Sequence, residues 1–184
     1  MNIDAKLALE IAAVVLTLTG LFAGLFQYRK AQKWKVLEFV ANEMKEFENE
    51  PEVQNAMYML DWDEKEILLY PDEEGDEKWE LVDSEMVYKS LEPNGRRFDE
   101  AEVAIRDSFD LFFSYLEGFE HYILTGLVKY ENLYPYITYW LDKISAGDKD
   151  LTKRIRQFLK TYEYTGVINL IKRNNEYKKM VKSN

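Results

Sequence analysis

The chain has 184 residues, a net charge of −10 and no cysteine, which excludes disulfide bonds, thiolate metal sites and cysteine nucleophiles. Its length suits one domain of about 100–150 residues with an additional element. The charge is segregated: residues 1–35 carry +3, residues 36–150 carry −20 and residues 151–184 carry +7. The acidic middle argues against nucleic-acid binding, whereas the basic C-terminal helices suit a phosphate-rich surface or the acidic middle of the same or a neighbouring chain.

The first predicted element is a membrane-spanning helix. No charged side chain occurs from Ile11 to Phe26, and the apolar run from Leu7 to Tyr28 contains one acid, Glu10. About 20 helical residues span the hydrocarbon of a bilayer, and the run is too long for a cleaved signal peptide. We therefore expect residues 1–28 to form a transmembrane anchor. The alternative is a buried N-terminal helix in a soluble oligomer.

Small and polar residues recur along the anchor at spacings of 3, 4, 3, 4 and 3, and they are Glu10, Ala13, Thr17, Gly20, Gly24 and Gln27. This repeat is typical of the contact face of a left-handed helix bundle, and Gly20 and Gly24 form a GxxxG motif. We name these six residues the seam. Because intramembrane polar groups usually face a bundle interior or water, the seam predicts a homo-oligomer, and in a larger ring Glu10, Thr17 and Gln27 would line a pore. The alternative is a lone anchor whose Glu10 reaches the outer interface.

Four bases follow the anchor, and they predict its orientation: Arg29, Lys30, Lys33 and Lys35. Basic residues beside a membrane segment stay on the cytoplasmic side. We expect a single-pass protein of the inner, or cytoplasmic, membrane, with its N-terminus outside. Residues 29–184 would form a cytoplasmic helical domain that starts with a juxtamembrane stalk helix over 29–50, since no glycine or proline separates anchor and stalk.

The first half of the cytoplasmic part mixes short helices with extended segments. Pro51 predicts the start of a short helix over 51–62, and a second short helix is expected over 83–91. The apolar segments 66–70 and 79–82 flank an acidic loop, so they predict a small β-hairpin. Residues 92–97 read as a turn.

The second half is predicted to be helical. The D-x-x-E spacing of Asp99 and Glu102 predicts a capping box for a long helix that ends at Leu124. Pro135 predicts the first turn of the next helix, which Gly147 ends. Two helices over 150–162 and 166–181 close the chain. The fold class is therefore mainly α, an N-terminal transmembrane helix continuing into a helical bundle with a small hairpin.

A polar stripe runs along the predicted long helix, formed by Arg106, Asp110, Ser114, Glu117 and His121, which lie within about 80° of one another. In a functional interpretation, His121, the one histidine of the chain, acts as an acid or base near Glu117 while Arg106 binds a phosphate. In the structural interpretation, which we favour, Arg106–Asp110 and Glu117–His121 are two i,i+4 pairs on a solvated or interhelical face.

The sequence predicts no metal and no cofactor. Glu117, Glu120 and His121 lack the Glu-x-x-His spacing of di-iron bundles. The chain contains no phosphate-binding glycine loop and no G-x-S-x-G motif, and the spacing of acids in the loop Asp72–Glu77 does not match an EF-hand.

The succession of the anchor, "AMYMLDW", "FDEAEVAIRDSFDLFFSYLEGFEHYILTGL" and "YPYITYWLDKI" resembles small bacterial and cyanobacterial proteins of uncharacterised function, which have one N-terminal membrane helix and a helical cytoplasmic domain. The resemblance covers most of the chain. A looser architectural likeness is to the membrane accessory proteins of type VI-B CRISPR loci, which join a membrane helix to a divergent HEPN-like domain, oligomerise as a pore and support antiviral defence. HEPN nucleases place a histidine shortly after an arginine, whereas no arginine occupies that window before His121.

These observations predict a non-enzymatic, single-span membrane protein that self-assembles through its anchor. The sharper version is an oligomeric pore or membrane effector in antiviral defence. One alternative is a membrane-tethered adaptor that recruits a cytoplasmic protein partner. The other is an atypical HEPN-like nuclease that uses Arg106 and His121.

Overall fold

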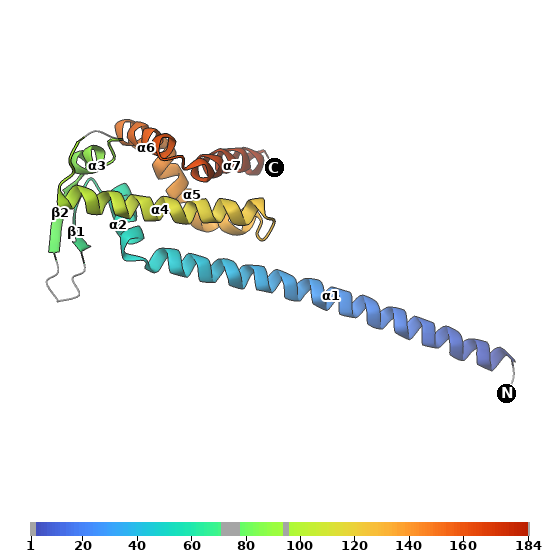
Figure 1. Cartoon of the computed structure of the whole chain (residues 1–184). Helices are drawn as coiled ribbons and strands as arrows, with labels where there is room; N and C mark the ends of the chain where they lie inside the picture. Colours follow the sequence, from blue (N-terminus) through green and yellow to red (C-terminus); the bar gives the residue numbers. More distant parts are fainter. Residues whose placement is uncertain (1–2, 71–77, 94–95, 184) are drawn as a thin grey trace. The chain divides into compact units, whose positions relative to one another are not determined.

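The computed structural model describes residues 3–70, 78–93 and 96–183, in which seven helices and two strands are present (Figure 1). This confirms the predicted mainly helical fold with a small antiparallel hairpin. In chain order the elements are α1 (Ile3–Asn49), α2 (Pro51–Asp61), β1 (Glu64–Tyr70), β2 (Lys78–Asp83), α3 (Ser84–Ser90), α4 (Glu100–Leu124), α5 (Tyr130–Ala146), α6 (Lys149–Thr161) and α7 (Thr165–Lys182).

The chain divides into two units, a first unit up to Ala41 and a second unit from Asn42 onward. α1 continues without interruption through this boundary, as predicted for an anchor and stalk with no glycine or proline between them. The expected stalk over 29–50 contributes to both units. Its residues from Asn42 onward belong to the second unit, where Met44 and Phe47 are buried.

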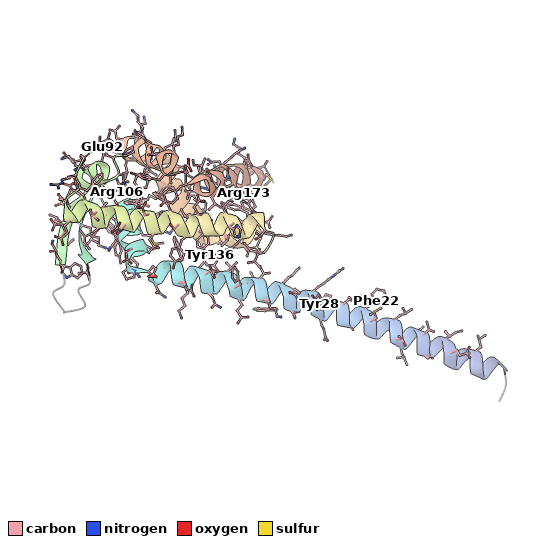
Figure 2. All side chains as sticks on the ribbon, viewed as in Figure 1. Phe22, Tyr28, Glu92, Arg106, Tyr136 and Arg173 are labelled. Atoms are coloured by element: carbon pink, nitrogen blue, oxygen red, sulfur yellow. The ribbon has the colours of Figure 1, made fainter. Side chains whose placement is uncertain are left out.

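The first unit is a helix whose apolar side chains are exposed from Ile11 to Trp34, whereas Val40 near its end is buried. Phe22 and Tyr28, for example, project from α1 with 68% and 62% of their surface accessible (Figure 2). Among the described residues, α1 is the one helix long and apolar enough to cross a membrane, with a mean hydropathy of 1.8 over an 18-residue window in which no residue is buried. A helix this apolar needs lipid or other helices to cover its surface.

The core of the second unit is built around α4, which contacts α2, α3, β1 and α7. Phe109, Phe112, Phe113 and Phe119 of α4 are at most 1% exposed. Phe47, from the end of α1, lies with its ring centroid 5.6 Å from that of Phe112 and 5.4 Å from that of Phe119. Such aromatic pairs contribute about 0.5–1.5 kcal/mol each beyond the burial of their area, so the apolar face of α4 organises the packing.

Local signals set the ends of several elements as predicted. The Asp99 carboxylate accepts the Glu102 backbone N–H at 2.8 Å, and the Glu102 carboxylate accepts the Asp99 N–H at 3.1 Å, which confirms the capping box. β1 and β2 pair antiparallel with Glu64 opposite Asp83. The acidic loop Asp72–Glu77 lies outside the described residues.

The predicted start of the fifth helix is wrong. α5 begins at Tyr130, so Pro135 lies inside it rather than in its first turn. Proline has no N–H to donate to the Glu131 carbonyl four residues earlier and crowds it, which costs about 3 kcal/mol inside a helix. The helix nevertheless starts earlier because Leu133 is buried at 1% exposure and the Lys129 N–H donates to the Asn132 side chain at 3.2 Å. Gly147 ends α5 as predicted.

Candidate functional site

The seam residues all lie on the exposed surface of α1. A Cβ added at Gly20 or Gly24 would meet no other atom within 4 Å, so both glycines present open backbone. The Thr17 hydroxyl donates to the Ala13 carbonyl at 2.8 Å, which satisfies its hydrogen inside the helix. The seam is therefore a smooth, small-residue strip on α1 that another helix can approach closely.

The basic juxtamembrane residues are exposed on the same helix and are Arg29, Lys30, Lys33 and Lys35. They follow the uncharged stretch directly and stay in helical geometry. Trp34, 65% exposed, lies among them. An amphipathic ring beside cations, next to an apolar helix, is the composition found at a membrane–water interface.

In the second unit, the predicted polar stripe of α4 meets other elements instead of forming pairs along its own helix. Among the described side chains, no ion pair joins Arg106 to Asp110 or Glu117 to His121, so the predicted i,i+4 pairs do not form at contact distance. The charge of Arg106 nevertheless opposes the rise that burial causes in the pKa of Asp110. The stripe lies beside α7 and the segment that precedes it, because α4 and α7 are in contact.

Arg106 clamps the end of α3. Its guanidinium donates to the backbone carbonyls of Ser90 and Glu92 at 2.6 and 3.1 Å and to the Tyr162 hydroxyl at 2.7 Å. The same group lies over the Phe98 ring, 4.3 Å from its centroid. The last carbonyls of a helix have no partner within it, so Arg106 satisfies orphan acceptors. Most N–H groups of its guanidinium therefore already donate to neutral oxygens, and few remain that could bind a phosphate.

Glu117 caps α7. Its carboxylate accepts the backbone N–H of Val167, the third residue of α7, at 3.0 Å. A negative charge at a helix N-terminus is favourable because the unpaired N–H groups and the helix dipole are positive there. Gly166 fits beneath this carboxylate, since a Cβ at that position would lie 2.9 Å from Glu117 Oε2. Glu117 therefore stabilises the start of α7 and does not act as a partner of His121.

Asp110 is the second acid of the stripe, and it binds Tyr164. The Tyr164 hydroxyl donates to Asp110 Oδ1 at 3.0 Å. Burial raises the pKa of Asp110 above its ordinary value, and burial together with the Asp110 charge raises the pKa of Tyr164 to about 12. The stripe therefore anchors the α6–α7 connection onto α4 at two points, Asp110 and Glu117.

His121 lies exposed near the end of α4. It follows Arg106 by fifteen residues on one continuous helix, a separation of about 22 Å at 1.5 Å per residue. A catalytic acid or base must come within hydrogen-bond reach of the reacting group. Arg106 and His121 are therefore too far apart to act together on one bond.

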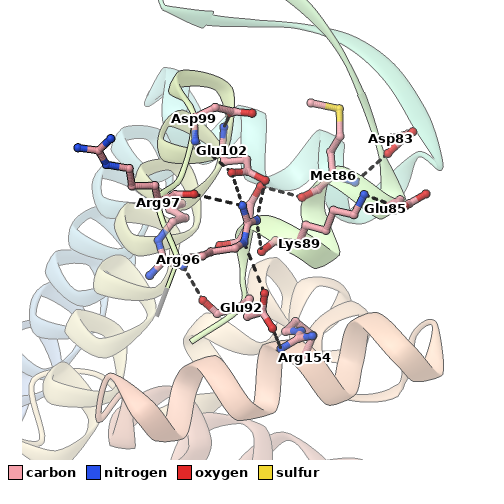
Figure 3. A network of polar contacts seen from close by, with 12 residues as sticks. Asp83, Glu85, Met86, Lys89, Glu92, Arg96, Arg97, Asp99, Glu102 and Arg154 are labelled. Carbon is pink, nitrogen blue, oxygen red and sulfur yellow. Dashed lines mark hydrogen bonds and ion pairs between the residues drawn. The ribbon is translucent and has the colours of Figure 1, made fainter. Parts of the chain in front are cut away.

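Sequence reasoning missed a polar network centred on Arg96 (Figure 3). Arg96 donates to both carboxylate oxygens of Glu102 at 2.7 and 2.6 Å and to the Lys89 carbonyl at 3.0 Å. Its Nε lies 3.5 Å from Glu92, whose carboxylate also lies 4.0 Å from Arg154. The hydrogen bond from Arg96 is the main reason that the pKa of Glu102 lies below its ordinary value. The network joins α3, α4 and α6, and its one sequence signal was the pair of arginines just before the capping box.

The basic C-terminal region pairs in part with the acidic middle of the same chain. Arg173 lies 2.9 Å from Glu120, a carboxylate only 2% exposed, and Lys178 pairs with Asp142. These contacts match the intrachain alternative for the segregated charges. Because Glu120 and Asp142 are paired within the chain, they are less available to bind the bases of a neighbouring chain.

A cavity of about 370 Å³ opens between α2, α3 and the start of α6 in the second unit. Its lining includes several acids, of which the Asp61 carboxylate lies 2.8 Å from Lys143 and also accepts the Tyr139 hydroxyl. Within the described ranges, no three His, Asp or Glu side chains are grouped so that they could hold a metal ion.

No family model matches the chain, and no curated protein and no solved structure match it.

Proposed function

We propose that the protein is a non-enzymatic, single-span membrane protein that assembles with copies of itself through the seam and holds a helical domain at the cytoplasmic surface. The observation that carries this proposal is the stretch from Ile11 to Phe26 of α1, which is uncharged and exposed along its whole length. The apolar run from Leu7 to Tyr28 is about 33 Å long as a helix, against a hydrocarbon core of about 30 Å.

The four juxtamembrane bases support the proposed orientation. Loops rich in lysine and arginine remain on the cytoplasmic side, so the second unit, which follows them, would be cytoplasmic. The second unit has its own aromatic core around α4, as expected for a folded domain that is carried on the anchor.

The seam supports self-association more than conduction. Glycine in a helix costs about 1 kcal/mol relative to alanine in water, and in membranes small residues allow helix backbones to approach closely. Thr17 donates its hydroxyl hydrogen to its own helix, so it does not require water at the middle of the span. A tightly packed seam is favoured over a polar-lined channel, although a ring that opens a pore would use the same residues.

The geometry of α4 gives the nuclease alternative no support. The guanidinium of Arg106 is held by the end of α3 and by Tyr162. His121 is about 22 Å away along the helix. A protein that acts by assembly and position, rather than by bond-making chemistry, fits these side chains better.

The test is the mass of the full-length protein in mild detergent, compared with Gly20→Ile/Gly24→Ile. Since an added Cβ at either glycine meets nothing within 4 Å, the substitution does not disturb an isolated α1, and any change of mass reports on contacts between chains. We expect a defined multimer that dissociates in this variant. The matched control is Ala12→Ile/Thr19→Ile, which adds two isoleucines to another face of α1 and should leave the multimer intact.

Either of two results would contradict the proposal: a monomeric wild type, or a multimer indifferent to Gly20 and Gly24. Both would leave α1 as a tether, and the adaptor alternative would then be favoured. If the multimer is confirmed, ion conductance in planar bilayers separates a pore from a closed assembly. Glu10→Gln and Thr17→Val should change conductance only if the seam lines a water-filled path.

A further inference from the structure

We propose that α6 carries a second membrane-contact site, a basic face that docks the second unit on anionic phospholipid headgroups. The basic face consists of Lys149, Lys153, Arg156 and Lys160. This inference rests on the proposed function, because only an anchored chain holds its second unit beside a membrane.

The four bases form one straight row on the helix. Their spacings of 4, 3 and 4 residues place them within about 60° of one another and along about 17 Å of the helix. All four side chains are exposed, whereas the other side of α6 is buried in the second unit through Thr152, Ile155, Phe158 and Leu159. α6 is therefore attached to the core by one side and presents the row of four bases on the other, where one acid of the helix, Asp150, is also exposed.

The basic face is not used within the chain. Among the residues that the structure describes, none of its four bases makes an ion pair, whereas Arg154, Arg173 and Lys178 of the same C-terminal region each pair with an acid. Lys149 is also the first residue of α6, where the positive end of the helix dipole disfavours a cation. The row thus contributes little to folding, and a partner outside the chain explains its arrangement better.

The charges around α6 indicate which class of partner the basic face binds. The whole chain carries −10, but salt screens charges beyond about 8 Å, so an anionic surface that touches α6 senses mainly the charges of this helix and its cap, where the four bases outnumber the exposed Asp148 and Asp150. The acidic middle of the chain, residues 36–150 with a charge of −20, then disfavours approach by most of the other surface of the second unit. The arc of the basic face contains no aromatic side chain, which single-stranded nucleic acids normally require for stacking.

Tethering favours lipid over other polyanions. Asn42, the first residue of the second unit, follows Lys35 by seven residues, about 10 Å of helix. If the juxtamembrane bases mark the headgroup layer, the second unit starts about 10 Å of helix away from it. A tether of this kind raises the effective concentration of the surface, so four bases suffice where a free protein would need more.

The experiment uses the full-length chain in lipid nanodiscs, made either of phosphatidylcholine alone or of phosphatidylcholine with phosphatidylglycerol. The chain has no cysteine, so Gln157→Cys, an exposed position beside the basic face, takes a single fluorophore without background labelling. A quencher attached to lipid headgroups reports its distance from the membrane. We expect strong quenching in the phosphatidylglycerol discs only, and a loss of quenching as salt is added.

Charge removal tests which residues are responsible. Each base near an anionic leaflet strengthens docking about fivefold, so Lys153→Gln/Arg156→Gln should weaken the docking equilibrium about 25-fold. The matched control, Lys172→Gln/Lys179→Gln, removes the same charge from exposed positions of α7 and should retain the quenching. Wild-type and variant chains should remain in neutral discs after an alkaline wash, which is the separate readout for the anchor.

Several outcomes would overturn the inference. If the chain stays in the discs but its quenching does not depend on phosphatidylglycerol, the docking site is refuted and the membrane anchor is not. If the alkaline wash removes the chain from neutral discs, both the docking site and the membrane anchor are refuted. Quenching that survives Lys153→Gln/Arg156→Gln would assign the contact to other residues. If the label is shielded only when a disc holds two copies of the chain, the basic face binds a second chain. If the label is shielded only when RNA is added, the basic face binds nucleic acid.

Discussion

Replacing Arg106 with alanine should destabilise the second unit strongly, because this side chain closes the end of α3. The substitution removes three hydrogen bonds, to the Ser90 carbonyl, the Glu92 carbonyl and the Tyr162 hydroxyl. Hydrogen bonds to charged groups contribute about 1.5–3 kcal/mol each, and a cation over an aromatic ring such as Phe98 contributes about 0.5–2 kcal/mol. Since these contributions overlap, we expect a loss of about 3–5 kcal/mol.

Thermal unfolding of the full chain, followed by circular dichroism in detergent, measures this loss. A change of 1 kcal/mol shifts the Tm of a domain of this size by about 2–4 °C, so Arg106→Ala should melt roughly 6–20 °C earlier. Arg106→Lys keeps the charge but not the fork of donors, and should recover only part of the loss. Arg97→Ala removes an exposed neighbouring arginine and should change the Tm little. A Tm for Arg106→Ala equal to that of Arg97→Ala would refute the clamp and restore Arg106 as a candidate for ligand binding.

Two further changes probe the ends of helices. The pKa of Glu102 is lowered, chiefly by its hydrogen bond from Arg96, so its contribution is present above its ordinary pKa of 4.5 and is lost as the pH falls through the lowered value. When the free energy of unfolding is measured against pH, the wild type should therefore lose more stability below this pH than Arg96→Gln does. Asp110 has the opposite effect on stability, but this effect is the same in both chains and cancels in the comparison. Glu163 has a φ of 59° after α6. Glu163→Gly should therefore raise the free energy of unfolding by about 1 kcal/mol in urea titration, because glycine adopts this conformation without strain.

The elements with strong local signals were predictable from the sequence. The capping box at Asp99 and the aromatic spacing that follows it defined α4 at both ends, because caps and apolar periodicity act within a few residues. The uninterrupted α1 was predictable for the same reason, since no helix breaker follows Gly24 before Pro51. In these segments local preference and tertiary packing agree.

The start of α5 and the partners of the polar stripe depended on distant residues and were not predictable. Proline at position 135 locally indicates a helix start, but burial of Leu133 outweighs the missing hydrogen bond. Arg106 had a neighbour of opposite charge four residues away, yet exposed i,i+4 pairs contribute only about 0.2–0.5 kcal/mol. The Ser90 carbonyl at the end of α3 and the Glu92 carbonyl just after it bind Arg106 more strongly, so the tertiary contact prevails. One sequence does not indicate which helix end will lie opposite a given arginine.

The distribution of polar groups along the seam bears on whether the proposed assembly conducts ions. Glu10 and Gln27 are seventeen residues apart, about 25 Å along a helix, which would place them near the two faces of a bilayer. Between them the seam holds only Ala13, the self-bonded Thr17 and two glycines. Selectivity filters are lined by groups that replace the hydration shell of an ion, and other pores are gated by hydrophobic constrictions that wet and dry. This middle therefore favours a closed bundle, in which polar rings near both ends set the register and the glycines set the distance between helices.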